Sequence, residues 1–350
     1  METTLPKKDI RKLKDADLQS FLIEKGEKAF RVKQVQEWLW KKSVRSFSEM
    51  TSLSLQTRQL LEDHFNILPV SIFKSQVSSD GTIKYAFQLH DKHLVEGVLI
   101  PANDRMTACI SSQVGCSLTC KFCATGYMKR LRNLDAAEIY DQVVEIRKQS
   151  ENIYNQPLTN IVYMGMGEPL LNYHNVLESV ERITSPQGLG MSAKRITVST
   201  AGIAKMIRQL GDDDVKFNLA LSLHAANDLK RSEMMPINET NNLDALRDAL
   251  KYFFLKTKNP VTYEYIVFKD FNDTLQDAEE LYRFCKHLPC KVNIIEYNPI
   301  AEANYMNTQE DKLERFKDYL EKKGVNVNIR KSRGKDIDAA CGQLANKSKN

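Results

Sequence analysis

The chain has 350 residues, 42% of them hydrophobic and 27% charged, a composition typical of a globular protein with a sizeable core. Its apolar runs all fall short of the roughly 18 residues that span a bilayer, and the charged N-terminal stretch METTLPKKDIRKLKDADLQ lacks the apolar region of a secretory signal. We therefore expect neither a membrane protein nor a disulfide-stapled secreted domain. The seven cysteines favour a reducing, cytoplasmic compartment, where clustered thiols bind metal or take part in chemistry.

The formal net charge is +5, from 50 basic and 45 acidic residues, and it is unevenly distributed. Residues 321–350 hold 8 Lys and Arg against 3 Asp and Glu, and the first fifty residues hold 12 against 8. Lys121, Lys129, Arg130 and Arg132 surround a cysteine-rich stretch. Basic ends and a basic rim favour a polyanionic partner such as RNA, although ordinary solvated lysines fit the same pattern.

The N-terminal third predicts two small units. Residues 1–66 predict a helical domain, because apolar residues recur at helical intervals in 18–26, 30–42 and 53–65. Residues 67–104 turn to short strand-like runs, which predict a β-meander or linker with a hairpin turn at Asp80–Gly81.

Residues 105–330 alternate strand-like and helical segments. This alternation predicts an α/β fold with right-handed crossovers and a parallel sheet, either open or curled into a partial (β/α)6 barrel with its site at the carboxyl ends of the strands. Residues 331–350 are polar and predict a C-terminal flap over the barrel. The nearly continuous apolar runs expected as strands are 106–113, 160–167, 195–202, 216–225, 261–268, 291–299 and 325–332, and the helical segments include 135–150, 175–184, 243–257 and 277–288.

The stretch CSLTCKFC places Cys116, Cys120 and Cys123 at CxxxCxxC spacing just after the first barrel strand. Structural zinc prefers two CxxC pairs or a Cys/His quartet, and neither His224 nor His287 lies at a zinc-finger interval. A catalytic zinc with three cysteines and a water stays open at this point. Iron–sulfur cubanes normally take four thiolates, so three would leave one iron free for an exogenous ligand.

The motif and its position resemble the radical S-adenosylmethionine (SAM) superfamily, whose three cysteines hold a 4Fe-4S cluster that also chelates SAM. The resemblance implies one cluster per chain, ligated by Cys116, Cys120 and Cys123. MGMGEP (164–169) is similar to the glycine-rich motif of that superfamily, which implies that Gly167 and Glu168 hold the SAM amino group; a plain glycine turn is the alternative. The other SAM contacts implied by the resemblance, each of which also fits an ordinary structural role, are Ser199, Ser222, Leu223, His224 and Asn298.

ACISSQVGCSLTCKFCATG, MGMGEPLLN, SLHAAND, MPIN and GKDIDAACGQLA together resemble the bacterial RlmN-type enzymes, and the resemblance covers essentially the whole chain. These enzymes methylate carbon 2 of adenine in 23S ribosomal RNA, at the peptidyl-transferase centre, and in transfer RNA, next to the anticodon. The resemblance implies both RNAs as partners, RNA binding by the helical N-terminal domain, two SAM per turnover and a reductant such as flavodoxin or ferredoxin. We expect a monomer.

Carbon 2 of adenine is electron-poor and does not attack the electrophilic methyl of SAM, whereas a thiolate does. The resemblance implies that Cys341, in the mobile flap, accepts a methyl, which a radical from a second SAM activates for addition to adenine. Attack by Cys109 on the Cys341 sulfur then leaves a disulfide and releases the methylated base. Glu96 is the proton acceptor implied by the resemblance, although a solvent-facing strand glutamate is the ordinary interpretation.

Two other functions stay open from the sequence. A Cfr-like enzyme, which methylates carbon 8 of adenine, shares the cluster and both extra cysteines, but Val114 and Pro169 favour the carbon 2 enzymes. The alternative from another class is a non-catalytic RNA-binding protein with structural zinc. Cys285 and Cys290 are predicted as core or near-core thiols without a function.

Overall fold

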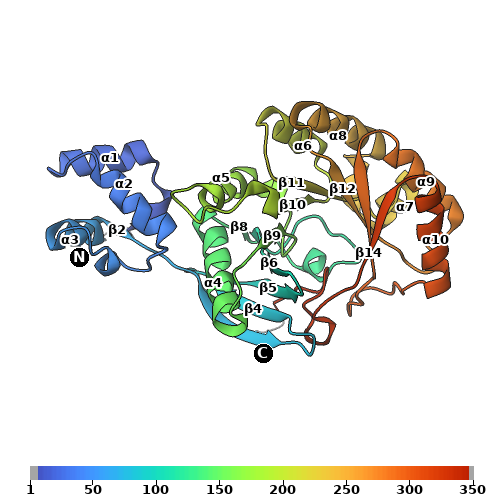
Figure 1. Ribbon diagram of the computed structural model, residues 1–350, viewed down its shortest axis with the longest axis horizontal. Helices are drawn as coiled ribbons and strands as arrows, with labels where there is room; N and C mark the ends of the chain where they lie inside the picture. Colours follow the sequence, from blue (N-terminus) through green and yellow to red (C-terminus); the bar gives the residue numbers. More distant parts are fainter. Residues whose placement is uncertain (1–6, 347–350) are drawn as a thin grey trace.

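The computed structural model describes residues 7–346, and Figure 1 shows a helical N-terminal part beside a long twisted sheet. Helices occupy the three segments where the apolar spacing predicts them. Between the second and third of these segments lies a 3-10 turn, and a short parallel strand pair joins the two ends of the helical part. The elements are β1 (Lys8–Asp9), η1 (Ile10–Lys12), α1 (Asp15–Glu24), α2 (Arg31–Gln36), the π-helical turn η2 (Glu37–Lys41), η3 (Phe47–Glu49), α3 (Leu55–His64) and β2 (Phe65–Asn66).

Capping residues define several helix ends. At the start of α3, the Ser54 hydroxyl accepts a hydrogen bond from the Thr57 amide at 3.0 Å. Asp135 and Glu138 form a capping box at the start of α4 (Ala136–Tyr154), and Asn155 ends that helix in the left-handed conformation.

Within residues 7–346, no helix is both long enough and apolar enough to cross a membrane.

One 10-stranded sheet runs in the order β14-β13-β12-β11-β10-β9-β6-β5-β4-β3. In this sheet, β6 and β9 to β14 pair in parallel, whereas β3 to β6 pair antiparallel, so the predicted meander continues the same sheet. The predicted turn at Asp80–Gly81 is confirmed between β3 and β4, where Gly81 has a φ of 84°. The strands are β3 (Ser71–Val77), β4 (Ile83–Gln88), β5 (Leu94–Ala102), β6 (Arg105–Cys109), β9 (Asn160–Tyr163), β10 (Ile196–Thr200), β11 (Asn218–Ser222), β12 (Val261–Ile266), β13 (Cys290–Ile295) and β14 (Asn326–Arg330).

Helices connect the parallel strands as the predicted partial (β/α)6 barrel requires. The sequence pattern does not single out α6, α7 or α10; in α10 only Phe316 and Leu320 are buried, so its apolar stripe is narrow. The connecting helices are α4, α5 (Tyr173–Thr184), α6 (Ala204–Asp212), α7 (Asp228–Met234), α8 (Leu243–Thr257), α9 (Leu275–Cys285) and α10 (Glu310–Lys322).

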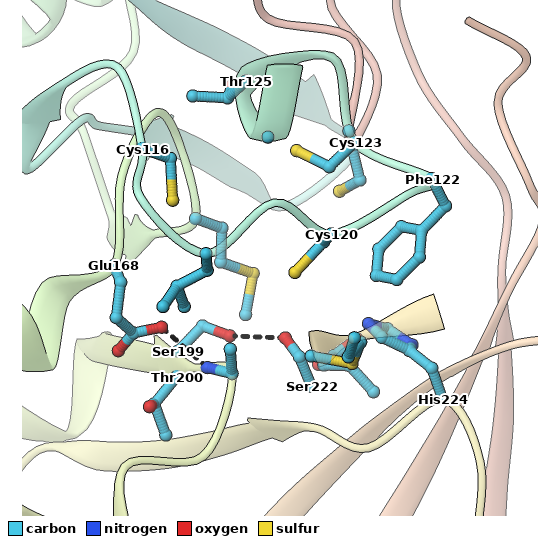
Figure 2. Close-up of a pocket in the computed structure, with 18 of the residues that line it drawn as sticks. Cys116, Cys120, Phe122, Cys123, Thr125, Glu168, Ser199, Thr200, Ser222 and His224 are labelled. Atoms are coloured by element: carbon cyan, nitrogen blue, oxygen red, sulfur yellow. Dashed lines mark hydrogen bonds between the residues drawn. The ribbon is translucent and has the colours of Figure 1, made fainter. Parts of the chain in front are cut away.

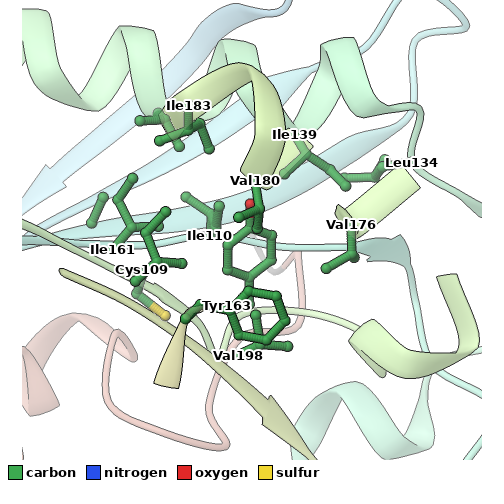
Figure 3. Close-up of a cluster of buried hydrophobic side chains, with 14 of the residues drawn as sticks. Cys109, Ile110, Leu134, Ile139, Ile161, Tyr163, Val176, Val180, Ile183 and Val198 are labelled. Carbon is green, nitrogen blue, oxygen red and sulfur yellow. The ribbon is translucent and has the colours of Figure 1, made fainter. Parts of the chain in front are cut away.

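The main hydrophobic core lies between the sheet and these helices. Figure 3 shows part of it, where α4 and α5 pack on β6, β9 and β10. Ile161 and Val198 are fully buried on adjacent strands, and Ile139 on α4 and Ile183 on α5 cover them. The buried Tyr163 hydroxyl keeps a partner, because it lies 2.8 Å from the Ser179 hydroxyl of α5.

A buried ion cluster attaches the helical part to the barrel. The Arg11 guanidinium donates to Asp141 of α4 at 2.8 Å and to Asp9 at 2.9 Å, and Asp141 also accepts from the Val70 amide at 3.0 Å. Burial opposes the charge of Arg11, but the two aspartates outweigh burial and raise its pKa. The N-terminal segment and the entry to β3 therefore share one electrostatic anchor on α4.

Replacing Arg11 by Met should lower the free energy of unfolding by about 3–5 kcal/mol, because two buried carboxylates lose their counter-charge. Urea denaturation followed by circular dichroism measures this change. The matched control is Arg147→Met on α4, the helix that carries Asp141; it removes an exposed pair with Glu151 and should cost less than about 1 kcal/mol. Equal losses in the two variants would contradict the anchoring role.

Candidate active site

A cavity of about 920 Å³ lies at the carboxyl ends of the parallel strands. Residues from the loop after β7 (Gln113–Val114), from the ends of β9 to β14, and from the C-terminal flap line it. Figure 2 shows the cysteine loop on one side of the cavity and the strand-end residues across from it. Its position agrees with the edge where barrel enzymes place their chemistry.

The cysteine loop is folded back on itself, so that Cys116, Cys120 and Cys123 all line the cavity. β7 pairs with β8 (Arg132–Asn133) and closes the base of the loop. The 3-10 turn η4 (Ala124–Tyr127) follows the third cysteine, and its Gly126 packs against Cys120: a Cβ there would lie 2.7 Å from the Cys120 carbonyl oxygen. Only glycine fits at this close backbone approach.

The three cysteines are free thiols in this structure. Burial raises the pKa of each of them, to about 11 for Cys116, and the neighbouring sulfurs add to the rise at Cys120. Three adjacent thiolates therefore need a compensating positive charge, such as iron supplies. Among residues 7–346, no three His, Cys, Asp or Glu side chains lie close enough together to hold a single metal ion. A cubane takes its ligands at separate iron atoms, so this three-thiol donor set fits an iron–sulfur cluster.

Glu168 lies across the cavity, held by backbone donors. Its carboxylate accepts from the Leu170 amide at 3.0 Å and from the Ala201 amide at 2.7 Å. Burial raises its pKa, and these two hydrogen bonds oppose the rise. Each oxygen keeps acceptor capacity for a ligand ammonium. Gly167 has a φ of 95°, and a Cβ there would lie 2.5 Å from the Cβ of Gln113, so this turn requires glycine.

Ser199 and Ser222 end neighbouring strands, and their hydroxyls lie 3.4 Å apart in the cavity wall. His224 follows with a φ of 55° and accepts from the Ile266 amide through Nδ1 at 3.1 Å. Burial lowers the pKa of His224 to about 3, so the ring is neutral and its Nε2 carries the proton. Phe122 of the cysteine loop packs edge-on against this ring.

Two predicted SAM contacts have other surroundings in this structure. The Leu223 side chain is fully buried in the main hydrophobic core and does not line the described cavity. Asn298 is buried and donates to the Cys341 carbonyl at 3.2 Å, while its own Oδ1 has no partner within the described chain. Asn298 therefore positions the flap and, like Leu223, does not line the described cavity in this conformation.

The flap crosses the cavity and carries Cys341 into it, as the sequence predicts. The Gly342 carbonyl accepts from the Ala124 amide at 2.7 Å, and the Leu344 carbonyl accepts from the Thr125 hydroxyl at 2.6 Å. Cys341 also lines a second hollow of about 720 Å³, together with Cys109 at the end of β6. Burial and the neighbouring Cys341 raise the pKa of Cys109 to about 12. Cys341 thus lies between two cavities, close to the second thiol.

Glu96 is buried in β5, with 1% of its surface exposed, so the solvent-facing interpretation is wrong. Its Oε2 accepts from the Ala345 amide at 2.9 Å and from the Asn346 amide at 3.1 Å, and Lys84 lies 3.7 Å from Oε1. Glu96 lines neither of the two cavities described above. In this conformation it anchors the end of the flap.

Known proteins resemble this chain over nearly its whole length. The sequence profile of the Radical SAM superfamily matches residues 110–285, and that of the ribosomal RNA large subunit methyltransferase N-terminal domain matches residues 8–67. A probable dual-specificity RNA methyltransferase RlmN from Cytophaga hutchinsonii is 66% identical over 98% of this chain and 94% of its own length. This chain belongs to the RlmN family of radical SAM RNA methyltransferases.

A second RlmN relative and a solved radical SAM methyltransferase structure also resemble this chain. A protein of the same name from Christiangramia forsetii is 57% identical over 98% of this chain and 97% of its own length. The crystal structure of a radical SAM methyltransferase from Sphaerobacter thermophilus superposes with a TM-score of 0.90 at 36% identity, covering 96% of this chain and 99% of that one. Membership of the superfamily implies a 4Fe-4S cluster and SAM, which the donor set of the cavity fits.

Sequence reasoning missed three charged residues that shape this RlmN-family site. Arg231 is fully buried and donates to the backbone carbonyls of Leu223 and Ala201, which ties the ends of β10 and β11 together. Glu264 and Arg330 form an ion pair of 3.1 Å in the cavity wall. The sequence does contain a signal for Glu264 and Arg330, because each is a charged residue at or near the end of a strand-like apolar run.

Acid should destabilise the native enzyme through His224. Unfolded histidine takes up a proton below pH 6.5, whereas buried His224, with a pKa of about 3, stays neutral in the folded state. Lowering the pH from 6.5 to 5 should therefore cost the wild type about 2 kcal/mol more than it costs His224→Asn. Asparagine tolerates the positive φ and offers Oδ1 in place of Nδ1.

Urea denaturation at each pH, at matched cluster content, measures this difference. The stability difference between wild type and variant should be constant above pH 7 and should shrink as the pH falls. If the stabilities of the two proteins changed with pH in parallel, the pKa of His224 would not be lowered in the folded state.

Proposed function

We propose that this chain methylates carbon 2 of adenine in 23S ribosomal RNA and in transfer RNA, using a methyl group carried by Cys341. The observation that supports the proposal is the place of Cys341, on a flap between the cavity of the three-cysteine loop and a hollow that contains Cys109. One side of this thiol faces the cavity suited to SAM, and the other faces a space that a nucleotide base can enter.

The cofactors have a set of candidate ligands in the first cavity. Cys116, Cys120 and Cys123 would hold the 4Fe-4S cluster, and Glu168 would accept hydrogen bonds from the SAM ammonium. Gly167, Ser199, Ser222 and His224 line the same cavity and are also assigned to SAM. Leu223 and Asn298 are assigned to SAM as well, but neither lines the cavity in this conformation. When bound, the cluster and SAM supply a methyl group and a hydrogen-abstracting radical.

The two thiols have successive roles in the proposed reaction. Desolvation raises the pKa of Cys341, and Arg330 opposes the rise, which favours the thiolate that accepts a methyl group. Once the methyl carbon has joined adenine, Cys109 attacks the Cys341 sulfur. The sulfur–carbon bond breaks, its electron pair stays with the carbon, which takes up a proton, and a Cys109–Cys341 disulfide remains. Reduction of this disulfide resets the enzyme.

Glu96 is the proposed acceptor of the proton lost from carbon 2 of adenine. Its Oε2 is engaged by two flap amides, whereas its buried Oε1 has no hydrogen-bond partner in the described chain. Because Glu96 lines neither cavity while it holds the flap, the flap must shift for the carboxylate to reach the base. The proposed proton transfer is thus linked to the movement of the segment that carries Cys341.

The remaining assignments concern domains and partners. We assign RNA binding to residues 1–66, β-meander strands to 67–104, the barrel to 105–330 and the methyl-carrying flap to 331–350. A low-potential reductant such as flavodoxin or ferredoxin would supply electrons, and the enzyme would act as a monomer in the cytoplasm, where its RNA substrates lie.

The product is tested by anaerobic reconstitution with deuterated-methyl SAM, reductant, ribosomal RNA and transfer RNA, followed by mass spectrometry of the nucleosides. We expect deuterium-labelled 2-methyladenosine. Labelled 8-methyladenosine would instead identify the Cfr-like reaction. A colourless protein that carries zinc and does not cleave SAM would identify a non-catalytic RNA-binding protein.

Replacing Cys341 by Ala should abolish methylation of the protein and of RNA, whereas Cys109→Ala should accumulate a covalent protein–RNA adduct. Both outcomes follow from the order in which the thiols act, and denaturing electrophoresis with radiolabelled RNA measures the adduct. Cys285→Ala is the matched control, because Cys285 lies outside both cavities. Normal product from both active-site variants would rule out the two-thiol scheme.

Glu96→Gln should retain methylation of Cys341 but slow product release by about 10²-fold or more, because an amide cannot take up the proton. The glutamine side-chain oxygen in Glu96→Gln still accepts hydrogen bonds from the flap amides, whereas Glu96→Ala loses this acceptor too. Comparing the two variants therefore separates flap anchoring from proton transfer. Single-turnover assays that follow protein methylation and RNA product independently measure both effects. Wild-type turnover by Glu96→Gln would assign the proton to another group.

A further inference from the structure

Two cysteines outside the catalytic cavity lie together at the opposite end of the barrel. Cys285 is the last residue of α9, and Cys290 is the first residue of β13. Because β13 runs parallel to its neighbours, its first residue lies at the amino edge of the sheet, away from the carboxyl edge that forms the active site. Both cysteines line a separate hollow of about 670 Å³, which Lys286 and Lys323 also line.

The two cysteines are in contact. The Cys290 thiol donates to the Cys285 carbonyl oxygen at 3.7 Å, and both side chains line the same hollow. Cys285 is buried, with 6% of its surface exposed, whereas Cys290 is half-buried and opens to the hollow. Both are free in this structure. A small reagent therefore meets Cys290 first, and Cys285 lies directly behind it.

The surroundings favour opposite protonation states for the two sulfurs. The neighbouring Cys285 side chain lowers the pKa of Cys290, whereas Cys290 and burial raise the pKa of Cys285. Cys285 also ends α9, where the negative end of the helix dipole disfavours a thiolate. Lys286 and Lys323 add positive charge along the hollow that Cys290 faces. Cys290 is thus the nucleophile, and Cys285 is the protonated partner.

We propose that Cys285 and Cys290 are a second redox-active dithiol, which closes to an intramolecular disulfide when it meets a small-molecule disulfide such as oxidised glutathione. The Cys290 thiolate attacks one sulfur of the reagent, forms a mixed disulfide and releases the first glutathione thiolate. Cys285 then loses its proton and attacks the Cys290 sulfur, which releases the second glutathione. The pair loses two electrons and two protons, and the reagent gains them as two thiols.

This dithiol is independent of the proposed methyl transfer, because neither cysteine lines the catalytic cavity or the hollow that contains Cys109. Closure of the disulfide would link the end of α9 covalently to the start of β13. The site would thus respond to the thiol–disulfide balance around the enzyme. This response would be independent of the Cys109–Cys341 disulfide that each catalytic turnover leaves.

The test treats the reduced full-length holoenzyme with oxidised glutathione, blocks free thiols with iodoacetamide and digests with trypsin. Trypsin cleaves after Arg283, Lys286 and Lys291, so the two cysteines fall on separate peptides, 284–286 and 287–291. We expect these two peptides to be joined, two hydrogens lighter than their sum. A Cys109–Cys341 disulfide joins other peptides, 106–121 and 336–347, so the two bonds are told apart directly.

Two variants sharpen the test. Cys285→Ser should keep glutathione on Cys290, because the resolving thiol is missing, and Cys290→Ser should leave Cys285 unmodified. In the reduced wild type, iodoacetamide should react about tenfold faster at Cys290 than at Cys285. RNA methylation by Cys290→Ser should equal that of the wild type. Persistent glutathione on Cys290 of the wild type, or alkylation of both thiols after oxidation, would overturn the proposal.

Discussion

Parallel pairing of the strands is the constraint on which the site depends. Each βα connection returns the chain to the same edge of the sheet, so strand ends that are far apart in sequence meet around one cavity. Ser199 on β10, Ser222 on β11 and Glu264 on β12 are adjacent because β10, β11 and β12 pair in register. The pairing of β6 with β9 extends this edge to Cys109, which is how the antiparallel meander and the barrel come to share one active site.

The flap completes a site that the barrel leaves open. It is attached at one end to the β3–β4 turn, where the Gly334 amide donates to Asp80 at 2.9 Å, and at the other end to Glu96 of β5. Between these anchors it contacts the cysteine loop through the Ala124 amide and the segment after β13 through Asn298. These hydrogen bonds hold the Cys341 thiol in place, so the flap moves only when they break.

Buried charges hold this architecture together and also shape its chemistry. Arg11 anchors the helical part on α4, and Arg231 ties strand ends below the cavity, each with its donors engaged by oxygen atoms. Burial keeps His224 neutral, and it disfavours the thiolates of the cysteine loop until a positively charged group binds there. The low-dielectric surroundings of the cavity therefore select both the protonation states and the kind of group that binds.

The sequence by itself determined the fold class, the family resemblance and the loop cysteines, because these depend on local periodicity and on short motifs. Cys116, Cys120, Cys123 and Glu168 are all named by residue type and spacing, and all of them line the cavity. Only the tertiary structure decided that Glu96 is buried beneath the flap, that Asn298 holds Cys341, and that Cys285 contacts Cys290. The reason is physical: a side chain's burial and its partners are set by packing and chain reversal, which the spacing of residues along the chain does not encode.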